Sequence, residues 1–202
     1  MTSNSTPAPK IPTITVGLRP FDPPLAGEHE PPVISALLAT LSACPEGGAR
    51  FVFALEGRID ALRLPEAGAP PVDPLWQHTC FEVFLSAPGQ ESYREYNFSP
   101  AGQWAGGQFR RYREFMHTLD VEAIIAPPVI ASTRRDGILT LEADLPSALL
   151  PSGPVLRAGL AAVIERGDGH LEYWAIRHPA ERPDFHHDGG WSLALDTRMI
   201  SV

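Results

Sequence analysis

The chain alternates between apolar and polar residues over many short segments, a pattern typical of half-buried β-strands. The clearest segments are residues 50–57, "RFVFALEG", and residues 138–145, "ILTLEADL". Each is predicted to cover a hydrophobic core with one face. The residues expected on these faces are Phe51, Phe53 and Leu55 in the first segment, and Leu139, Leu141, Ala143 and Leu145 in the second.

Further short strands are predicted at roughly ten-residue spacing, separated by turns rich in Gly and Pro. "TCFEVFLS" (79–86) and "SYREYNFS" (92–99) predict a hairpin, and "QWAGGQFRRYR" (103–113) adds a third strand. A second hairpin is expected around the turn "RGDG" (166–169). The other predicted strands are residues 155–165 and 171–177 in that hairpin, 13–18 at a sheet edge, and 191–195 at the end of the sheet.

Two segments have helical character. In "VISALLATL" (33–41) the apolar residues follow helical spacing and predict a short helix, and "PSALLPSG" (146–153) predicts one helical turn. The whole pattern indicates an all-β fold: a two-sheet antiparallel β-sandwich, jelly-roll-like, with one or two short peripheral helices. In residues 33–41, the apolar residues that follow helical spacing are Val33, Ile34, Leu37, Leu38 and Leu41.

At 202 residues the chain has the length of one β-sandwich domain. We expect residues 1–12, rich in Ser, Thr and Pro, to be a flexible N-terminal segment and residues 13–202 to form a single domain. The 22 prolines and 17 glycines favour short strands over long helices.

The chain carries 16 Lys and Arg against 24 Asp and Glu, a net charge of −8, so no nucleic-acid partner is expected. The basic run "RRYR" (110–113) is interpreted as a solvated strand face. We find no apolar run of signal-peptide or membrane-span length, so we expect a cytoplasmic protein without a membrane partner. Cys44 and Cys80 are expected to be reduced thiols, although one bridge between them stays open.

Three motifs together carry a resemblance to a known family: "LWQHTCFEVFL", "YREYNFSPAGQWAGGQFRRYR" and "HPAERPDFH". In order and spacing they resemble the bacterial DOMON-like family, related to family-nine carbohydrate-binding modules, over the region from Phe51 to Leu195. The resemblance implies a β-sandwich that binds a sugar or haem on a concave face or between its sheets. It places Trp76 at the family's tryptophan and Glu82 at the glutamate of the next strand. Gln77 and His78 replace the acidic pair expected after the tryptophan.

An aromatic platform is the first candidate site. Trp76 and Trp104 would stack on a sugar ring while Glu82, Asn97 and Arg113 orient its hydroxyl groups. The alternative is that both tryptophans are core residues. For Glu82 we expect the commoner case of an exposed strand carboxylate, because a buried one would need a partner such as Arg94.

The loop "RHPAERPDFHHDGGW" (177–191) is the second candidate. Its His and Asp residues suggest a metal site, but their spacing matches no zinc signature. Anchoring of the loop by histidine hydrogen bonds and direct ligand contact are the alternatives, with His178 and His186 lining or bracing the mouth of a pocket. The metal ligands therefore remain unknown.

No motif demands catalysis, so no catalytic residues are assigned. Cofactors are unknown, and a haem site is poorly matched because Met116 and His117 are adjacent in sequence. We expect a non-catalytic module that binds a small molecule, first a carbohydrate or sugar-containing metabolite. The alternatives are a protein-interaction module with an exposed aromatic face and, third, a metal-dependent enzyme built on residues 177–191.

Overall fold

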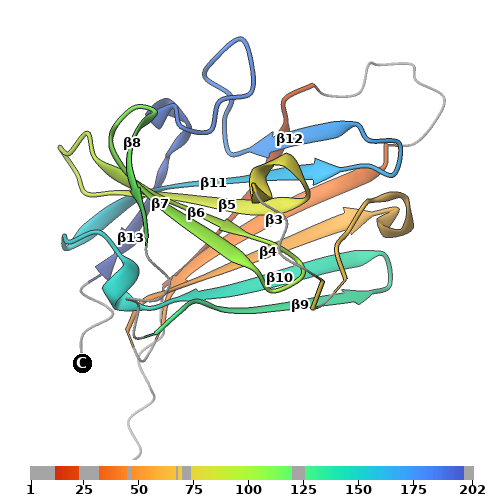
Figure 1. Cartoon of the computed structure of the whole chain (residues 1–202), viewed down its shortest axis with the longest axis horizontal. Helices are drawn as coiled ribbons and strands as arrows, with labels where there is room; N and C mark the ends of the chain where they lie inside the picture. The colour runs from red at the N-terminus through yellow and green to blue at the C-terminus, as the bar shows by residue number, and fades with distance from the viewer. Residues whose placement is uncertain are drawn as a thin grey trace, which may run out of the picture.

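Two antiparallel sheets packed face to face make up the fold. The computed structural model describes residues 12–22, 32–44, 47–66, 68–69, 74–119 and 126–197, so part of the expected N-terminal segment (1–11) lies outside the described residues. In Figure 1 the strands of the larger sheet cross in front of β3 and β4 of the smaller one. The smaller sheet has the order β1 (Thr13–Gly17), β3 (Ile34–Ala43), β4 (Ala49–Gly57), β10 (Ile138–Leu145) and β9 (Val129–Arg135).

The larger sheet contributes one face to the core and leaves the other free for a site. Its last strand in the chain, β13 (Leu193–Asp196), pairs with the start of β11. The order of the remaining strands is β2 (Arg19–Pro20), β12 (Leu171–Ala175), β11 (Val155–Glu165), β5 (Cys80–Ser86), β6 (Tyr93–Phe98), β7 (Trp104–Arg111) and β8 (Glu114–Thr118).

The main hydrophobic core lies between the two sheets, where the alternating strands meet. Phe53 on β4 contacts Phe81 on β5, with ring centroids 4.9 Å apart, and both side chains are fully buried. The core face of β5 continues with Val83 and Leu85, and that of β6 consists of Tyr96 and Phe98. The predicted all-β sandwich is therefore confirmed.

Both predicted hairpins form. β5 and β6 pair antiparallel, as do β11 and β12. The strands predicted from residues 50–57 and 138–145 are paired neighbours, and their expected core faces are buried. The edge strand at residues 13–18 and the last strand near 191–195 are also present, as β1 and β13. Cys44 and Cys80 are buried and not joined by a disulfide.

The helix predicted at residues 33–41 is wrong, because this segment is the ten-residue strand β3. A β-bulge lies between Ile34 and Ala36, and it shifts the alternation by one residue. Beyond the bulge Leu37, Ala39 and Leu41 face the core, while Leu38 is 46% exposed. The bulge and the small alanine at every second core position produced the apparent helical spacing.

In the described part of the chain, helical structure is limited to single 3-10 turns. The turn predicted from "PSALLPSG" is confirmed as η3, whereas β8 and β9 had no clear sequence signal and were not predicted. No helix in the described residues is long and apolar enough to cross a membrane. The four turns are η1 (Ile59–Ala61), η2 (Leu75–Gln77), η3 (Ser147–Leu149) and η4 (Asp188–Gly190).

Two neighbouring leucines on β3 test the strand assignment. We expect Leu37→Ala to lower the free energy of unfolding by about 2–5 kcal/mol, because it empties a core position. Leu38→Ala is expected to change it by only about 0.5 kcal/mol, because that side chain faces solvent. Urea denaturation of both variants measures the difference, and equal losses would contradict the strand.

Candidate functional site

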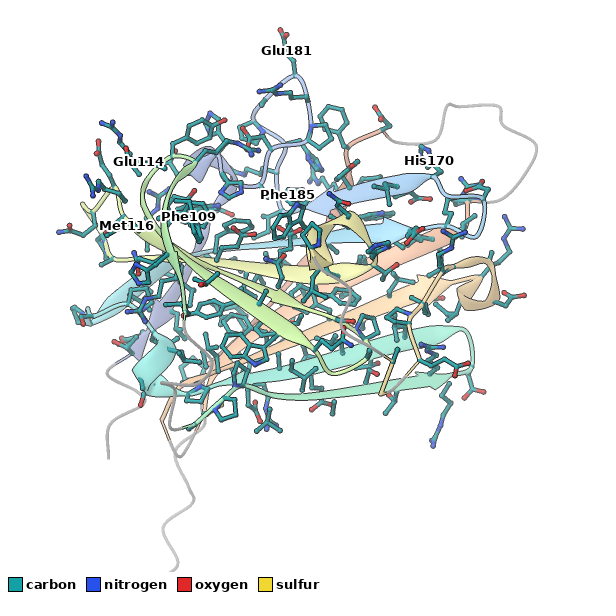
Figure 2. All side chains as sticks on the ribbon, viewed as in Figure 1. Phe109, Glu114, Met116, His170, Glu181 and Phe185 are labelled. Atoms are coloured by element: carbon teal, nitrogen blue, oxygen red, sulfur yellow. The ribbon has the colours of Figure 1, made fainter. Side chains whose placement is uncertain are left out.

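A cavity of about 650 Å³ lies on the face of the larger sheet that is turned away from the main core. Its floor comes from β5, β6, β7, β11 and β12, and loop residues close its sides. Figure 2 shows Phe185 above β5 and β11, on the loop whose outer tip is marked by Glu181. The lining residues are Trp76, Gln77, Glu82, Glu95, Asn97, Ala105, Gly106, Gly107, Phe109, Arg113, Phe115, Thr118, Val163, Leu171, Tyr173, Pro183, Phe185 and His186.

The register of β5 with β6 places polar side chains on this floor. Phe81 pairs with Phe98 and Glu82 pairs with Asn97. Since successive strand residues point to opposite faces, a core of Phe81, Val83 and Leu85 sends Glu82 to the cavity side. The same alternation on β6 turns Glu95 and Asn97 toward the cavity.

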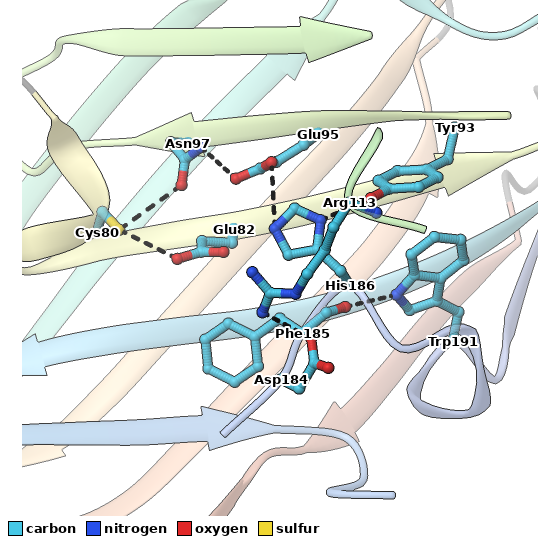
Figure 3. A network of polar contacts seen from close by, with 10 residues as sticks. All are labelled: Cys80, Glu82, Tyr93, Glu95, Asn97, Arg113, Asp184, Phe185, His186 and Trp191. Carbon is cyan, nitrogen blue, oxygen red and sulfur yellow. Dashed lines mark hydrogen bonds and ion pairs between the residues drawn. The ribbon is translucent and has the colours of Figure 1, made fainter. Parts of the chain in front are cut away.

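A buried polar network crosses the floor (Figure 3). The Cys80 thiol lies 3.6 Å from Glu82 Oε1 and 3.8 Å from Asn97 Oδ1. Asn97 Nδ2 donates to Glu95 Oε1 at 2.8 Å. Glu82 is 4% exposed and Glu95 is 8% exposed, so both carboxyl groups have lost most contact with bulk water.

His186 joins the floor from the loop above it. Its Nδ1 lies 2.7 Å from the Tyr93 hydroxyl, which also accepts a hydrogen bond from the backbone N–H of Arg113. Burial raises the pKa of Tyr93 to about 12, so the hydroxyl keeps its proton at neutral pH. The imidazole tautomer decides which of the two groups donates in this hydrogen bond. The other ring nitrogen, Nε2, lies 3.8 Å from Glu95 Oε2.

Arg113 enters the cavity from the turn between β7 and β8. Its φ of 55° lies in the left-handed region, which a non-glycine residue rarely adopts. The guanidinium donates to Asp184 Oδ1 at 2.9 Å, and Asp184 also accepts a hydrogen bond from the Tyr112 hydroxyl. Burial works against ionisation of Asp184, but the hydrogen bonds from Tyr112 and Arg113 hold its pKa below the usual value. This ion pair ties the β7–β8 turn to the loop.

The environment of the floor favours uncharged side chains. Burial, reinforced by the neighbouring Glu95, raises the pKa of Glu82 well above its usual value. Burial also raises the pKa of Glu95. Burial and the nearby charge of Arg113 lower the pKa of His186 to about 4, with Asp184 acting in the opposite direction. The imidazole is therefore neutral at neutral pH.

An aromatic cluster beside the cavity fixes the loop in place. Phe84 stacks on Trp191, and Tyr93 stacks on Phe109 with ring centroids 4.7 Å apart. Trp191 Nε1 donates to the carbonyl of Phe185 at 2.9 Å. A Cβ at Gly159 would lie 2.1 Å from the Trp191 ring, so only glycine allows this contact. The cluster holds Phe185 and His186 over the sheet.

Five of the seven predicted site residues line the cavity. They are Trp76, Glu82, Asn97, Arg113 and His186. The other two lie elsewhere: Trp104 packs against the core between the sheets, and His178 Nε2 lies 2.8 Å from the carbonyl oxygen of Arg19. The two tryptophans thus do not form a common platform. Trp76, half exposed, is the one that faces the cavity.

The expectation that Glu82 is solvent-exposed is wrong, because the β5–β6 register places it on the enclosed floor. Arg94 is not its partner, since Arg94 Nε donates to Gln108 Oε1 at 3.0 Å. Sequence reasoning also missed Tyr173 and Phe185 as lining residues. Alternation along β12 gives a signal for Tyr173, whereas Phe185 lies in a loop and had none.

The histidine-rich loop does not assemble a metal centre. Within the described residues, no group of three or more His, Cys, Asp and Glu side chains is placed to hold an ion. His187 Nδ1 instead accepts a hydrogen bond from the backbone N–H of Gly189, and His186 belongs to the Tyr93 contact described above. The loop histidines act here as hydrogen-bonding groups.

Comparison with known proteins gives similarity of fold. A Bacteroides uniformis ATCC 8492 structure, described as that of a candidate carbohydrate-binding protein, aligns with a TM-score of 0.58 at 16% identity, covering 80% of this chain and 78% of the other. No family model and no curated protein matches the chain, so membership of the DOMON-like family is not established. This likeness supports the β-sandwich fold.

Two structures of a family-nine carbohydrate-binding module from Caldicellulosiruptor kristjanssonii are less similar. The complex with cellotriose aligns with a TM-score of 0.44 at 10% identity, covering 82% of this chain and 79% of the module. The complex with glucose aligns with a TM-score of 0.42 at 12% identity, covering 87% and 91%. The comparison of folds therefore rests on the Bacteroides protein.

Replacement of Glu82 by Gln tests whether its buried carboxyl group is protonated in the folded protein. A carboxyl whose pKa is raised in the folded state favours folding while it is protonated, and this contribution is lost as pH rises above the unfolded value of 4.5. We therefore expect Glu82→Gln to raise the melting temperature at about pH 8 and to change it little at about pH 4. Each 1 kcal/mol corresponds to roughly 2–4 °C for a chain of this length.

The matched control for this comparison is Glu91→Gln, in the exposed turn between β5 and β6. It removes a carboxylate from a solvated position. The melting temperature of this variant should therefore stay close to that of the unmodified protein at both pH values. A Glu82→Gln variant that is less stable than the unmodified protein at pH 8 would show that the carboxylate is ionised and well paired.

Proposed function

We propose that the protein is a non-catalytic module that binds a small saccharide or sugar-containing metabolite in the cavity on the larger sheet. The observation that carries this proposal is the pairing of an exposed indole, Trp76, with a buried polar floor in one cavity. A sugar ring has an apolar C–H face and a rim of hydroxyl groups, so it needs both kinds of surface.

The size and chemistry of the cavity suit such a ligand. Its volume of about 650 Å³ falls in the range of about 300–1,000 Å³ typical of small-molecule sites. Trp76 provides a flat apolar surface for the ring, while Glu82, Glu95 and Asn97 provide hydrogen-bonding groups below it. A cavity of this volume has room for a mono- or disaccharide, or for a nucleotide-linked sugar.

The likeness of fold makes saccharides the first class to test, because the Bacteroides protein is described as a candidate carbohydrate-binding protein. Relationship to the bacterial DOMON-like proteins is the finer part of the proposal and rests on the sequence motifs "LWQHTCFEVFL" and "HPAERPDFH". A cytoplasmic location, expected from the sequence, is likewise part of the proposal and agrees with a small, diffusible ligand.

A protein partner is the second candidate, favoured by apolar side chains on the β7–β8 hairpin beside the cavity. Tyr112 is 53% exposed, Phe115 is 53% exposed and Met116 is 47% exposed. Figure 2 shows Met116 on this hairpin, near Glu114. A partner that docks here would contact Phe115, which also lines the cavity, and would therefore compete with a saccharide for that side chain.

Truncation of the indole tests the site. We expect Trp76→Ala to weaken saccharide binding about 30-fold or more, since a central aromatic contact contributes about 2 kcal/mol or more. Isothermal titration calorimetry measures the affinity, and the half-exposed position of Trp76 means that the variant should stay folded. Leu38→Ala, on the other sheet, removes an exposed apolar side chain and should leave the affinity unchanged. Equal affinity of Trp76→Ala and the unmodified protein would remove Trp76 from the site.

A further inference from the structure

We propose that the ligand of this cavity carries an ammonium group, and that an amino sugar is the class that matches both its floor and its walls. The inference rests on the proposed function, because it concerns the same cavity. It goes further in assigning a charge to the ligand. The basis is a pair of buried carboxyl groups, Glu82 and Glu95, neither of which forms an ion pair with an Arg or Lys side chain among the described residues.

Glu82 is the first of these groups. Its side chain is more than nine-tenths buried and lines the cavity. Among the described residues its only hydrogen-bond partner is the Cys80 thiol, at 3.6 Å. That thiol has one proton and lies between Glu82 and the Asn97 carbonyl oxygen, so it can satisfy only one of them at a time. Glu82 therefore keeps an acceptor available to a ligand.

Glu95, the second group, has only neutral partners. Asn97 donates an amide hydrogen to one oxygen, and His186 Nε2 lies 3.8 Å from the other. Burial and the charge of Arg113 lower the pKa of His186 to about 4, so the imidazole is neutral at neutral pH and offers no full positive charge. The direct contacts of this carboxyl are thus neutral groups, and the charge of Arg113 acts on it without a hydrogen bond.

The cation that lines the cavity is already paired. Arg113 is the only Lys or Arg among the described lining residues, and its guanidinium donates to Asp184 at 2.9 Å. Asp184 is 7% exposed, so this ion pair is well shielded from solvent on its acidic side. Among the described residues Arg113 forms its ion pair with Asp184. Its charge also favours ionisation of Glu82 and Glu95, but burial outweighs it and the pKa of both stays raised. Neither glutamate forms an ion pair with an Arg or Lys side chain within the described part of the chain.

The walls complete a site for a cation. Aromatic rings attract a cation through the negative potential on their faces, and this attraction is strongest where water is excluded. Several rings line the cavity around the carboxyl floor, from both the sheet and the loops. They are Trp76, Phe109, Phe115, Tyr173 and Phe185. An ammonium group at the floor would meet Glu82 and Glu95 below and aromatic surface beside it.

Binding of a cation should also displace protons from the floor. An ammonium group stabilises the ionised carboxylate, so a carboxyl that is protonated in the empty cavity releases its proton on binding. Calorimetry in buffers with different ionisation enthalpies detects this release directly. The titratable and charged groups that face the two glutamates are Cys80, Tyr93, Arg113, Tyr173, Asp184 and His186.

The test compares four small molecules by isothermal titration calorimetry at slightly acidic pH. Glucosamine has the ring and the ammonium group; glucose and N-acetylglucosamine have the ring without the charge; cyclohexylamine has the ammonium group without hydroxyls. We expect glucosamine to bind about 10- to 100-fold more tightly than glucose, as for a hydrogen bond to a charged group. N-acetylglucosamine is expected to bind no better than glucose.

Two variants link this preference to the floor. Glu82→Gln and Glu95→Gln keep the shape of each side chain and remove its charge, so each should reduce the preference for glucosamine over glucose. Glu91→Gln, exposed in the β5–β6 turn, is the matched control and should keep the preference. Because both sugars are measured on the same variant, a loss of folding would abolish both affinities, whereas the inference predicts a selective loss.

The outcomes separate the two proposals. Equal binding of glucose and glucosamine would overturn the ammonium inference and leave a saccharide site in place. Binding of cyclohexylamine without binding of any sugar would support the ammonium group and overturn the saccharide assignment. Absence of binding by all four molecules would overturn both.

Discussion

The antiparallel register of β5 and β6 is the constraint on which both the core and the cavity depend. With Glu82 opposite Asn97, the odd-numbered residues of β5 enter the core between the sheets, while Glu82 lies on the opposite face and lines the cavity. A slip of one residue would exchange the two sets and bury charged groups in the main core. Tight packing such as that of Phe53 on Phe81 therefore also fixes the chemistry of the opposite face.

The second organising feature is the way in which loops are held over that face. Arg113 and Asp184 join the β7–β8 turn to the loop after β12, and Trp191 holds the same loop through the carbonyl of Phe185. These contacts bring residues far apart in the sequence to the rim of one cavity. They also pair Arg113, which is the only Arg or Lys among the described lining residues, with Asp184, so neither Glu82 nor Glu95 has an ion pair with a basic side chain there.

Strong alternation made much of the fold predictable, because it indicates which face of a strand is buried. Examples are Phe51, Phe53 and Leu55 on β4, and Leu139 and Leu141 on β10. The same reasoning failed at β3, where a bulge beside Ile34 and small alanines disguised the strand. For the site, Trp76, Glu82, Asn97, Arg113 and His186 could be selected as residue types that bind ligands. The burial of Glu82 and the separation of Trp104 from Trp76 could not be predicted from the sequence, because they depend on strand register and on the path of loops.

The central claim is that a ligand enters the cavity above Glu82 and Glu95. Amide chemical-shift mapping by NMR during titration with glucosamine tests it most directly, because it locates the contact as well as detecting it. The account predicts that the perturbed amides cluster on β5, β6 and β7 near the floor and on the loop at Phe185 and His186. Perturbations centred on the smaller sheet, at β3, β4 or β10, would contradict it.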